Sequence, residues 1–132
     1  CHHGKEEEGL FPALGQTGMP TQMGPIPKMI VEHKMTEKLA EQIKICVQSY
    51  FESGDSNNLI LSLENYITHV REHLWKENNR LFMMADSRLN SVSKEVNDRL
   101  EKIEETKLSE LGKSRSEYEK LVSDLENSVS KI

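Results

Sequence analysis

Residues Leu59–Phe82 read LILSLENYITHVREHLWKENNRLF, and this stretch decides the fold. Its apolar residues recur at spacings of three and four, which is the repeat of an amphipathic helix. The members of the stripe are Leu59, Leu63, Tyr66, Val70, His73, Glu77 and Leu81. The stretch therefore predicts a long helix that turns one imidazole and one carboxylate toward the core.

A second helix of the same kind is predicted just before it. Between Lys28 and about Glu52 the stripe consists of Met29, His33, Thr36, Ala40, Ile43, Val47 and Tyr50. The sequence Ser53-Gly54-Asp55-Ser56 then supplies a stop signal and an N-cap. Because so few residues separate the two helices, we expect an antiparallel hairpin.

The rest of the chain also favours helices over strands. Residues 11–27 are rich in proline and glycine and predict a long connecting loop after a short first helix. Beyond residue 86, apolar stripes predict two more helices on either side of Gly112, the last with a stripe from Tyr118 to Ile132. The expected fold class is all-α, an up-down antiparallel helical bundle with extra C-terminal helices. Residues 1–86 are expected to hold the site, and residues 87–132 to be a helical extension that packs on the bundle.

Composition argues against several classes of function. The 132 residues carry a net charge of −5 without a Lys/Arg-rich tract, so neither nucleic acid nor a membrane is expected as a partner. No apolar run approaches the length of about 18 residues that a membrane span needs. Cys1 and Cys46 are far apart in sequence and are expected to be reduced. With no leader segment recognised, these features predict a cytoplasmic protein.

Histidine is followed by glutamate four residues later at four places in the chain. The pairs are His2 with Glu6, His3 with Glu7, His33 with Glu37, and His73 with Glu77. On a helix, positions i and i+4 lie one above the other on the same face. Each pair therefore points an imidazole and a carboxylate at one place, which is what a metal ion requires.

The sequence context of two pairs is also repeated. The repeated offsets are those of His2, Glu6, Leu10 and Phe11 in one copy, and of His73, Glu77, Leu81 and Phe82 in the other. The pairs that begin at His33 and His73 lie on core stripes, where an ionised carboxylate costs several kcal/mol unless it is paired or bound to a cation. The hairpin is expected to bring these four candidate ligands together, in a setting where mixed nitrogen and carboxylate metal sites are built.

Other interpretations of these residues need no metal. A single exposed pair contributes only tenths of a kcal/mol and is common on solvated faces. His3 and Glu7 are rotated by about 100° from the preceding pair, so we expect them on the surface, with His3 as a substitute ligand at most. His69, one turn before His73, either orients a ligand or is a polar neighbour.

The chain resembles the hemerythrin-like family of HHE cation-binding domains from residue 1 to about residue 86. The likeness is carried by His2-His3-Gly4-Lys5-Glu6-Glu7 with Leu10-Phe11-Pro12, by Glu32-His33, and by His73-Leu74-Trp75-Lys76-Glu77 with Leu81-Phe82. The resemblance implies an up-down four-helix bundle around two non-haem irons, bridged by carboxylates, that meet oxygen, nitric oxide or related small oxidants.

The resemblance also implies a role for each candidate ligand. The implied metal ligands are His2, Glu6, His33, Glu37, His73 and Glu77. Glu6 and Glu77 would bridge the irons, and His33 and His73 would bind one of them. Glu37 stands where family members often have a further histidine, and His2 would bind the other iron.

Three features depart from the family pattern. The family's first helix, which contributes a histidine to the second iron, is absent from this sequence. We expect exchange between protomers of a homodimer, or a tail helix at 114–131, to cover the core in its place. Glu37 in place of histidine makes the first iron more anionic and more easily held as ferric, which argues against reversible oxygen carriage. Met83 replaces a usual proline, a change expected to be structural.

The favoured function is a di-iron module that binds or senses oxygen or nitric oxide, or handles iron, without an organic substrate. No further acid, base or nucleophile is grouped with the ligands. The alternatives are an enzyme or an iron-sulfur repair and iron-donor factor that uses the same irons, and a metal-free helical interaction domain. Manganese or zinc can replace iron in a carboxylate-rich site.

Overall fold

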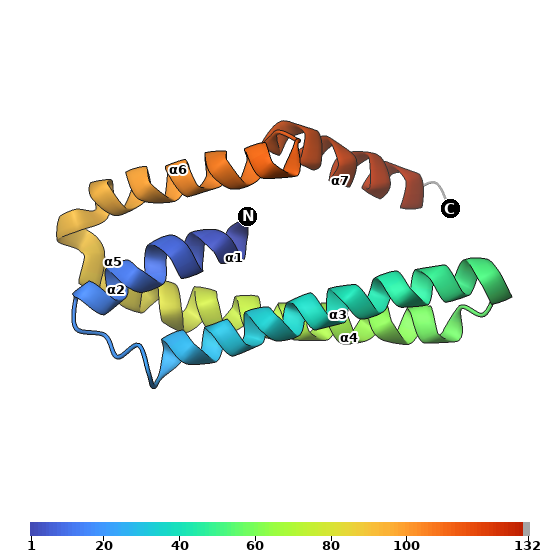
Figure 1. Cartoon of the computed structure of the whole chain (residues 1–132), viewed down its shortest axis with the longest axis horizontal. Helices are drawn as coiled ribbons and strands as arrows, with labels where there is room; N and C mark the ends of the chain where they lie inside the picture. Colours follow the sequence, from blue (N-terminus) through green and yellow to red (C-terminus); the bar gives the residue numbers. More distant parts are fainter. Residues whose placement is uncertain (131–132) are drawn as a thin grey trace. The chain divides into compact units, whose positions relative to one another are not determined.

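The computed structural model describes residues 1–130, and every regular element in this range is a helix (Figure 1). The predicted all-α fold class is confirmed. The chain forms two compact units, one of Ala13–Ser91 and one of Cys1–Pro12 together with the chain from Val92 onward. None of the helices described combines the length and the apolar content needed to cross a bilayer.

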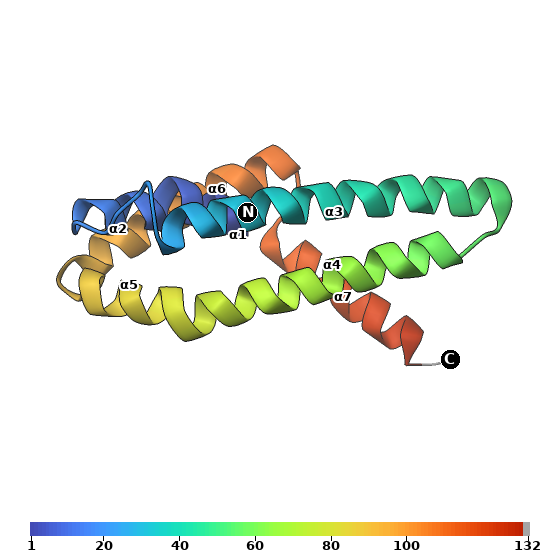
Figure 2. The same cartoon turned by 90° about the horizontal axis from the view of Figure 1, so that it is seen from below.

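The first unit is built on a helical hairpin. Helices α3 (Pro25–Ser53) and α4 (Asn57–Lys76) lie side by side and run antiparallel in both views (Figures 1 and 2). Gly54 ends α3 in a left-handed conformation with a φ of 75°, and its N–H donates to Tyr50 O at 2.8 Å. The predicted hairpin is therefore confirmed.

The chain continues from α4 through a π turn, η2 (Glu77–Leu81), into α5 (Phe82–Leu89) and the short 3₁₀ helix η3 (Asn90–Val92). The buried apolar residues of this unit gather where α3 begins and where α4 passes into α5. They are Ala13, Leu14, Met19, Ile26, Met29, Leu81, Ala85 and Leu89, whereas the buried Cys46 lies farther along α3. His33 lies near the beginning of α3 and His73 lies in the last turn of α4, so both are next to this buried region.

The predicted loop at residues 11–27 is too long. Phe11–Gln16 forms helix α2, and α3 already begins at Pro25. Pro25 and Pro27 lie in the first turn of α3, where a missing N–H breaks no helical hydrogen bond. Proline and glycine marked the region correctly, but only residues 17–24 lack a regular element.

The second unit packs the beginning of the chain against its C-terminal part. Helix α1 (His2–Lys5) and the π turn η1 (Glu6–Leu10) run antiparallel to α6 (Ser93–Leu111). Lys5 pairs with Glu104, and Lys107 Nζ lies 2.7 Å from Glu8 Oε1. Gly9 permits the close approach, since a Cβ there would lie 2.5 Å from Leu100 Cδ2 and 3.0 Å from Ile103 Cδ1.

Helix α7 (Arg115–Val129) follows the break at Gly112. Its first turn has a capping box, in which the Ser114 side chain accepts from the N–H of Glu117 and the Glu117 side chain accepts from the N–H of Ser114. The two predicted C-terminal helices are therefore present. Ile132, the last residue of the predicted stripe, lies outside the described residues.

The division into residues 1–86 and residues 87–132 stays a prediction, and the two compact units meet along the chain at Pro12 and at Ser91. Cys1–Pro12 belongs with the C-terminal helices, because its charged and small residues contact α6. Sequence periodicity identified the long helices but carried no information about this long-range pairing.

Candidate metal centre

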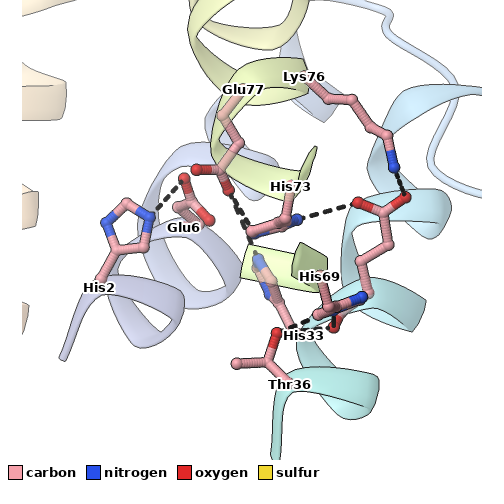
Figure 3. Close-up of polar contacts among 9 residues, drawn as sticks. His2, Glu6, His33, Thr36, His69, His73, Lys76 and Glu77 are labelled. Atoms are coloured by element: carbon pink, nitrogen blue, oxygen red, sulfur yellow. Dashed lines mark hydrogen bonds and ion pairs between the residues drawn. The ribbon is translucent and has the colours of Figure 1, made fainter. Parts of the chain in front are cut away.

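His33, His73 and Glu77 come together in the hairpin unit (Figure 3). Glu77 Oε1 lies 2.8 Å from His73 Nε2 and 3.8 Å from His33 Nε2. The two imidazole rings meet edge to face with centroids 5.0 Å apart. One ligand atom of each residue lies within 4.8 Å of the others. His33 and His73 are 1% exposed and Glu77 is 0% exposed, so the cluster is shielded from solvent.

The local structure explains why these side chains meet. His33 lies in the third turn of α3, and His73 lies in the last turn of α4. In an antiparallel hairpin the beginning of one helix faces the end of the other, so the two imidazoles share one level. Glu77 follows His73 by four positions and therefore lies one turn beyond it on the same face.

The two glutamates of the repeated motif each begin a π turn. In η1 the N–H of Phe11 donates to Glu6 O, and in η2 the N–H of Phe82 donates to Glu77 O. The repeat seen in the sequence is thus also a repeat of backbone structure, one copy in each compact unit. Single π turns inside α-helices occur frequently at functional sites. Periodicity did not predict these turns, because the apolar residues around a π turn are still three or four positions apart in the sequence.

Glu32 and Lys76 extend the cluster, and neither was predicted to have a role. Glu32 Oε2 lies 3.0 Å from His73 Nδ1, and Glu32 Oε1 accepts from Lys76 Nζ at 2.7 Å. Burial by itself would raise the pKa of Glu32, but the hydrogen bonds from Lys76 and His73 outweigh it and the pKa is lowered. Glu32 precedes His33 by one position, about 100° around the helix, so no single-helix pattern could find it.

His69 connects the two helices beside the cluster. Its Nε2 lies 3.0 Å from the backbone oxygen of Glu32 and 3.1 Å from Thr36 Oγ1. Because a carbonyl oxygen can only accept, Nε2 of His69 donates in this contact. The His69 ring is parallel to that of His73, with centroids 6.4 Å apart. The geometry is that of the polar neighbour, one of the two interpretations left open by the sequence.

Comparison with known protein families shows which family this chain belongs to. The hemerythrin HHE cation-binding domain matches residues 1–85. The chain belongs to this family. The resemblance and the helical bundle expected from the sequence are both confirmed. A search of curated proteins and a search of solved structures each gave no match.

The donor set of this HHE domain suits a metal ion. Two imidazole nitrogens and one carboxylate oxygen converge in a buried position, and these are ligand types that transition metals accept. An ionised carboxylate as dry as that of Glu77 costs several kcal/mol unless a positive charge is close. The cluster is therefore able to bind a metal ion, as the family match implies.

Glu37 does not face the interior of the HHE domain, so that expectation is wrong. Its side chain is exposed, whereas Thr36 is buried. The buried residues of α3 advance as Met29, His33 and Thr36, which turns the covered face toward position 36 and away from position 37. Position i+4 from His33 is on the same broad side of the helix, but α4 covers only part of that side.

His2 and Glu6 meet in the other unit of the HHE domain. His2 Nε2 lies 3.6 Å from Glu6 Oε1, with Glu6 buried and the His2 side chain half exposed (Figure 3). The i,i+4 pairing predicted from the sequence is therefore formed. Glu7 is exposed, in line with the surface position expected for the rotated pair. The role of His2 and Glu6 as metal ligands stays a prediction.

Proposed function

We propose that this chain is a non-haem di-iron module that binds or senses oxygen, nitric oxide or a related small oxidant, or handles iron. The observation that carries the proposal is the buried meeting of His33, His73 and Glu77 in a cation-binding family. Iron, when bound, supplies redox chemistry and an affinity for diatomic ligands.

In this proposal His33, His73 and Glu77 would hold iron in the hairpin unit. His2 and Glu6 stay predicted ligands. For His2 and Glu6 the support is the repeated motif and a family match that spans both copies. Glu37 is left out of the ligand set because it is exposed.

The surroundings of the cluster favour binding over catalysis. The polar side chains next to it are engaged with one another, since Lys76 donates to the carboxylate of Glu32, His73 contacts that carboxylate, and His69 donates to the carbonyl of Glu32. A general acid or base needs a proton that it can exchange with a substrate. We further propose a cytoplasmic location, supported by two free thiols, Cys1 and Cys46.

The test is metal analysis of protein purified without oxygen, followed by rapid-mixing optical spectra with oxygen and with nitric oxide. We expect about two irons per chain and a stable spectral change on adding either gas. Glu77→Gln should lose iron, whereas Glu72→Gln, the same substitution at an exposed position of α4, should retain it.

Other results select the alternatives. Sustained consumption of peroxide or nitric oxide would support an enzyme, and transfer of iron to an iron-sulfur apoprotein would support an iron donor. Less than about one metal of any kind per chain, with unchanged folding, would support a metal-free interaction domain and reject the proposal. Manganese and zinc are measured alongside iron because the same donors accept them.

A further inference from the structure

The ring of His73 is held at both nitrogens by carboxylates from different helices. Nδ1 lies 3.0 Å from Glu32 Oε2 on α3, and Nε2 lies 2.8 Å from Glu77 Oε1 in η2. A neutral imidazole has one N–H and one lone pair, and which nitrogen has which depends on the partners of the ring. A metal ion requires the lone pair, so the identity of the protonated nitrogen decides whether His73 can be a ligand.

Glu32 is held in place by contacts of both its side chain and its backbone. Its second carboxylate oxygen accepts from Lys76 at 2.7 Å, and its side chain is only 12% exposed. Its backbone oxygen accepts from the Thr36 hydroxyl at 3.0 Å and from His69 at 3.0 Å. The residue is therefore held at its backbone and at its side chain, and its Oε2 lies 3.0 Å from His73 Nδ1.

We propose that Glu32 is a positioning residue that keeps the proton of His73 on Nδ1 and so presents the lone pair of Nε2 to a metal beside Glu77. Lys76 neutralises Glu32 and occupies its other oxygen, which keeps this carboxylate directed at the ring. Carboxylates that accept from the remote nitrogen of a metal-binding histidine fix its orientation and raise its basicity. The role rests on the metal-binding function proposed above and adds a residue to it.

The first measurement needs no metal. A long-range proton–nitrogen correlation spectrum of the metal-free protein reports which nitrogen of each histidine is protonated. In the wild type we expect a proton on Nδ1 of His73. In Glu32→Leu we expect the proton to move to Nε2, where Glu77 accepts it. Glu37→Leu, the same substitution at an exposed position of α3, should leave the His73 signals as in the wild type.

The second measurement uses Zn²⁺ as a diamagnetic probe in competition with a chelator. Glu32→Leu should weaken Zn²⁺ binding by about 10- to 100-fold, and Glu37→Leu should change it less than about twofold. Equal affinity of wild type and Glu32→Leu, or a wild-type Nδ1 without a proton, overturns the role of Glu32. The wild-type spectrum decides this even if Glu32→Leu does not fold.

The two proposals fail in different ways. A wild type that binds neither Zn²⁺ nor iron rejects the metal centre, and the spectrum of the metal-free protein still tests whether Glu32 places the proton. A wild type that binds Zn²⁺ while Glu32→Leu binds it equally well rejects only the role of Glu32.

Discussion

Glu77 Oε1 lies 2.8 Å from His73 Nε2, and both side chains are almost wholly shielded from solvent. The contact joins the last turn of α4 to the first residue of η2, so it ties the end of a regular helix to a π turn. A carboxylate in this setting is stable only beside compensating donors or a cation. Stability and metal binding therefore depend on the same pair.

Replacing His73 tests that dependence. His73→Ala should lower the free energy of unfolding by about 3 kcal/mol, because it removes one partner of a buried pair and leaves the Glu77 carboxylate without it. Metal should be lost at the same time. Urea denaturation and elemental analysis measure the two effects, with exposed Glu72→Ala as the control. An unaltered metal content in His73→Ala would contradict the assignment of His73.

The π turn η2 is expected to set the direction of Glu77. Deleting Asn79 should convert the turn to an ordinary helical turn and rotate the residues on its two sides by about 100° relative to each other. Helix content by circular dichroism should persist while metal is lost.

Asn79→Ala is the matched control. It removes the hydrogen bond from Asn79 Nδ2 to Trp75 O, which is 2.8 Å long, without changing the register. It should therefore keep its metal. Retention of wild-type metal affinity by the deletion variant would show that the π turn does not direct Glu77.

Gly9 is expected to be required for the packing of η1 on α6. Gly9→Ala should lower the free energy of unfolding by about 1–3 kcal/mol, since its Cβ overlaps Leu100 Cδ2. The intrinsic preference of alanine for helices, about 1 kcal/mol, acts in the opposite direction. Combining it with Leu100→Ala should cost less than the sum of the single changes. Strict additivity would mean that the two side chains do not meet.

Acid should weaken the α1–α6 pairing through Glu104. The hydrogen bond from Lys5, with further help from Arg115, holds the pKa of Glu104 below its ordinary value. A lowered folded-state pKa gives stability that is present above the unfolded value and is lost as pH falls through the folded value. Glu104→Gln should therefore lose less stability than the wild type between about pH 6 and pH 3. Denaturation across this range measures the slopes, and exposed Glu101→Gln should keep the wild-type slope.

The homodimer expected from the sequence has a candidate surface on α4. Apolar residues at spacings of three and four are exposed or half-buried there, namely Ile60, Leu63, Ile67, Val70 and Leu74. If copies associate through this stripe, Ile67→Glu should shift a dimer to monomer in sedimentation velocity experiments, and exposed Asn65→Glu should not. A wild type that stays monomeric at all concentrations would reject the homodimer.

The candidate ligands show which buried residues can be predicted from their spacing along one helix. His33, His73 and Glu77 were found because a histidine or glutamate on an apolar stripe must share the buried face of its helix. Glu37 lay on the same side by spacing alone, yet α4 covers the neighbouring position 36 instead. The width of a buried face depends on how a partner helix crosses it. The sequence of one helix does not determine that crossing.

By itself, the sequence determined the helical class, the hairpin, the repeated His-x-x-x-Glu motif and three residues of the cluster, since these follow from periodicity along one helix. Only the tertiary structure decided that Glu32 on α3 contacts His73 on α4, and that η1 packs on α6. Such contacts join residues 41 or more positions apart, as with Glu32 and His73, and depend on the relative placement of two helices. Local backbone preference fixes each helix, whereas packing between helices fixes which polar side chains meet.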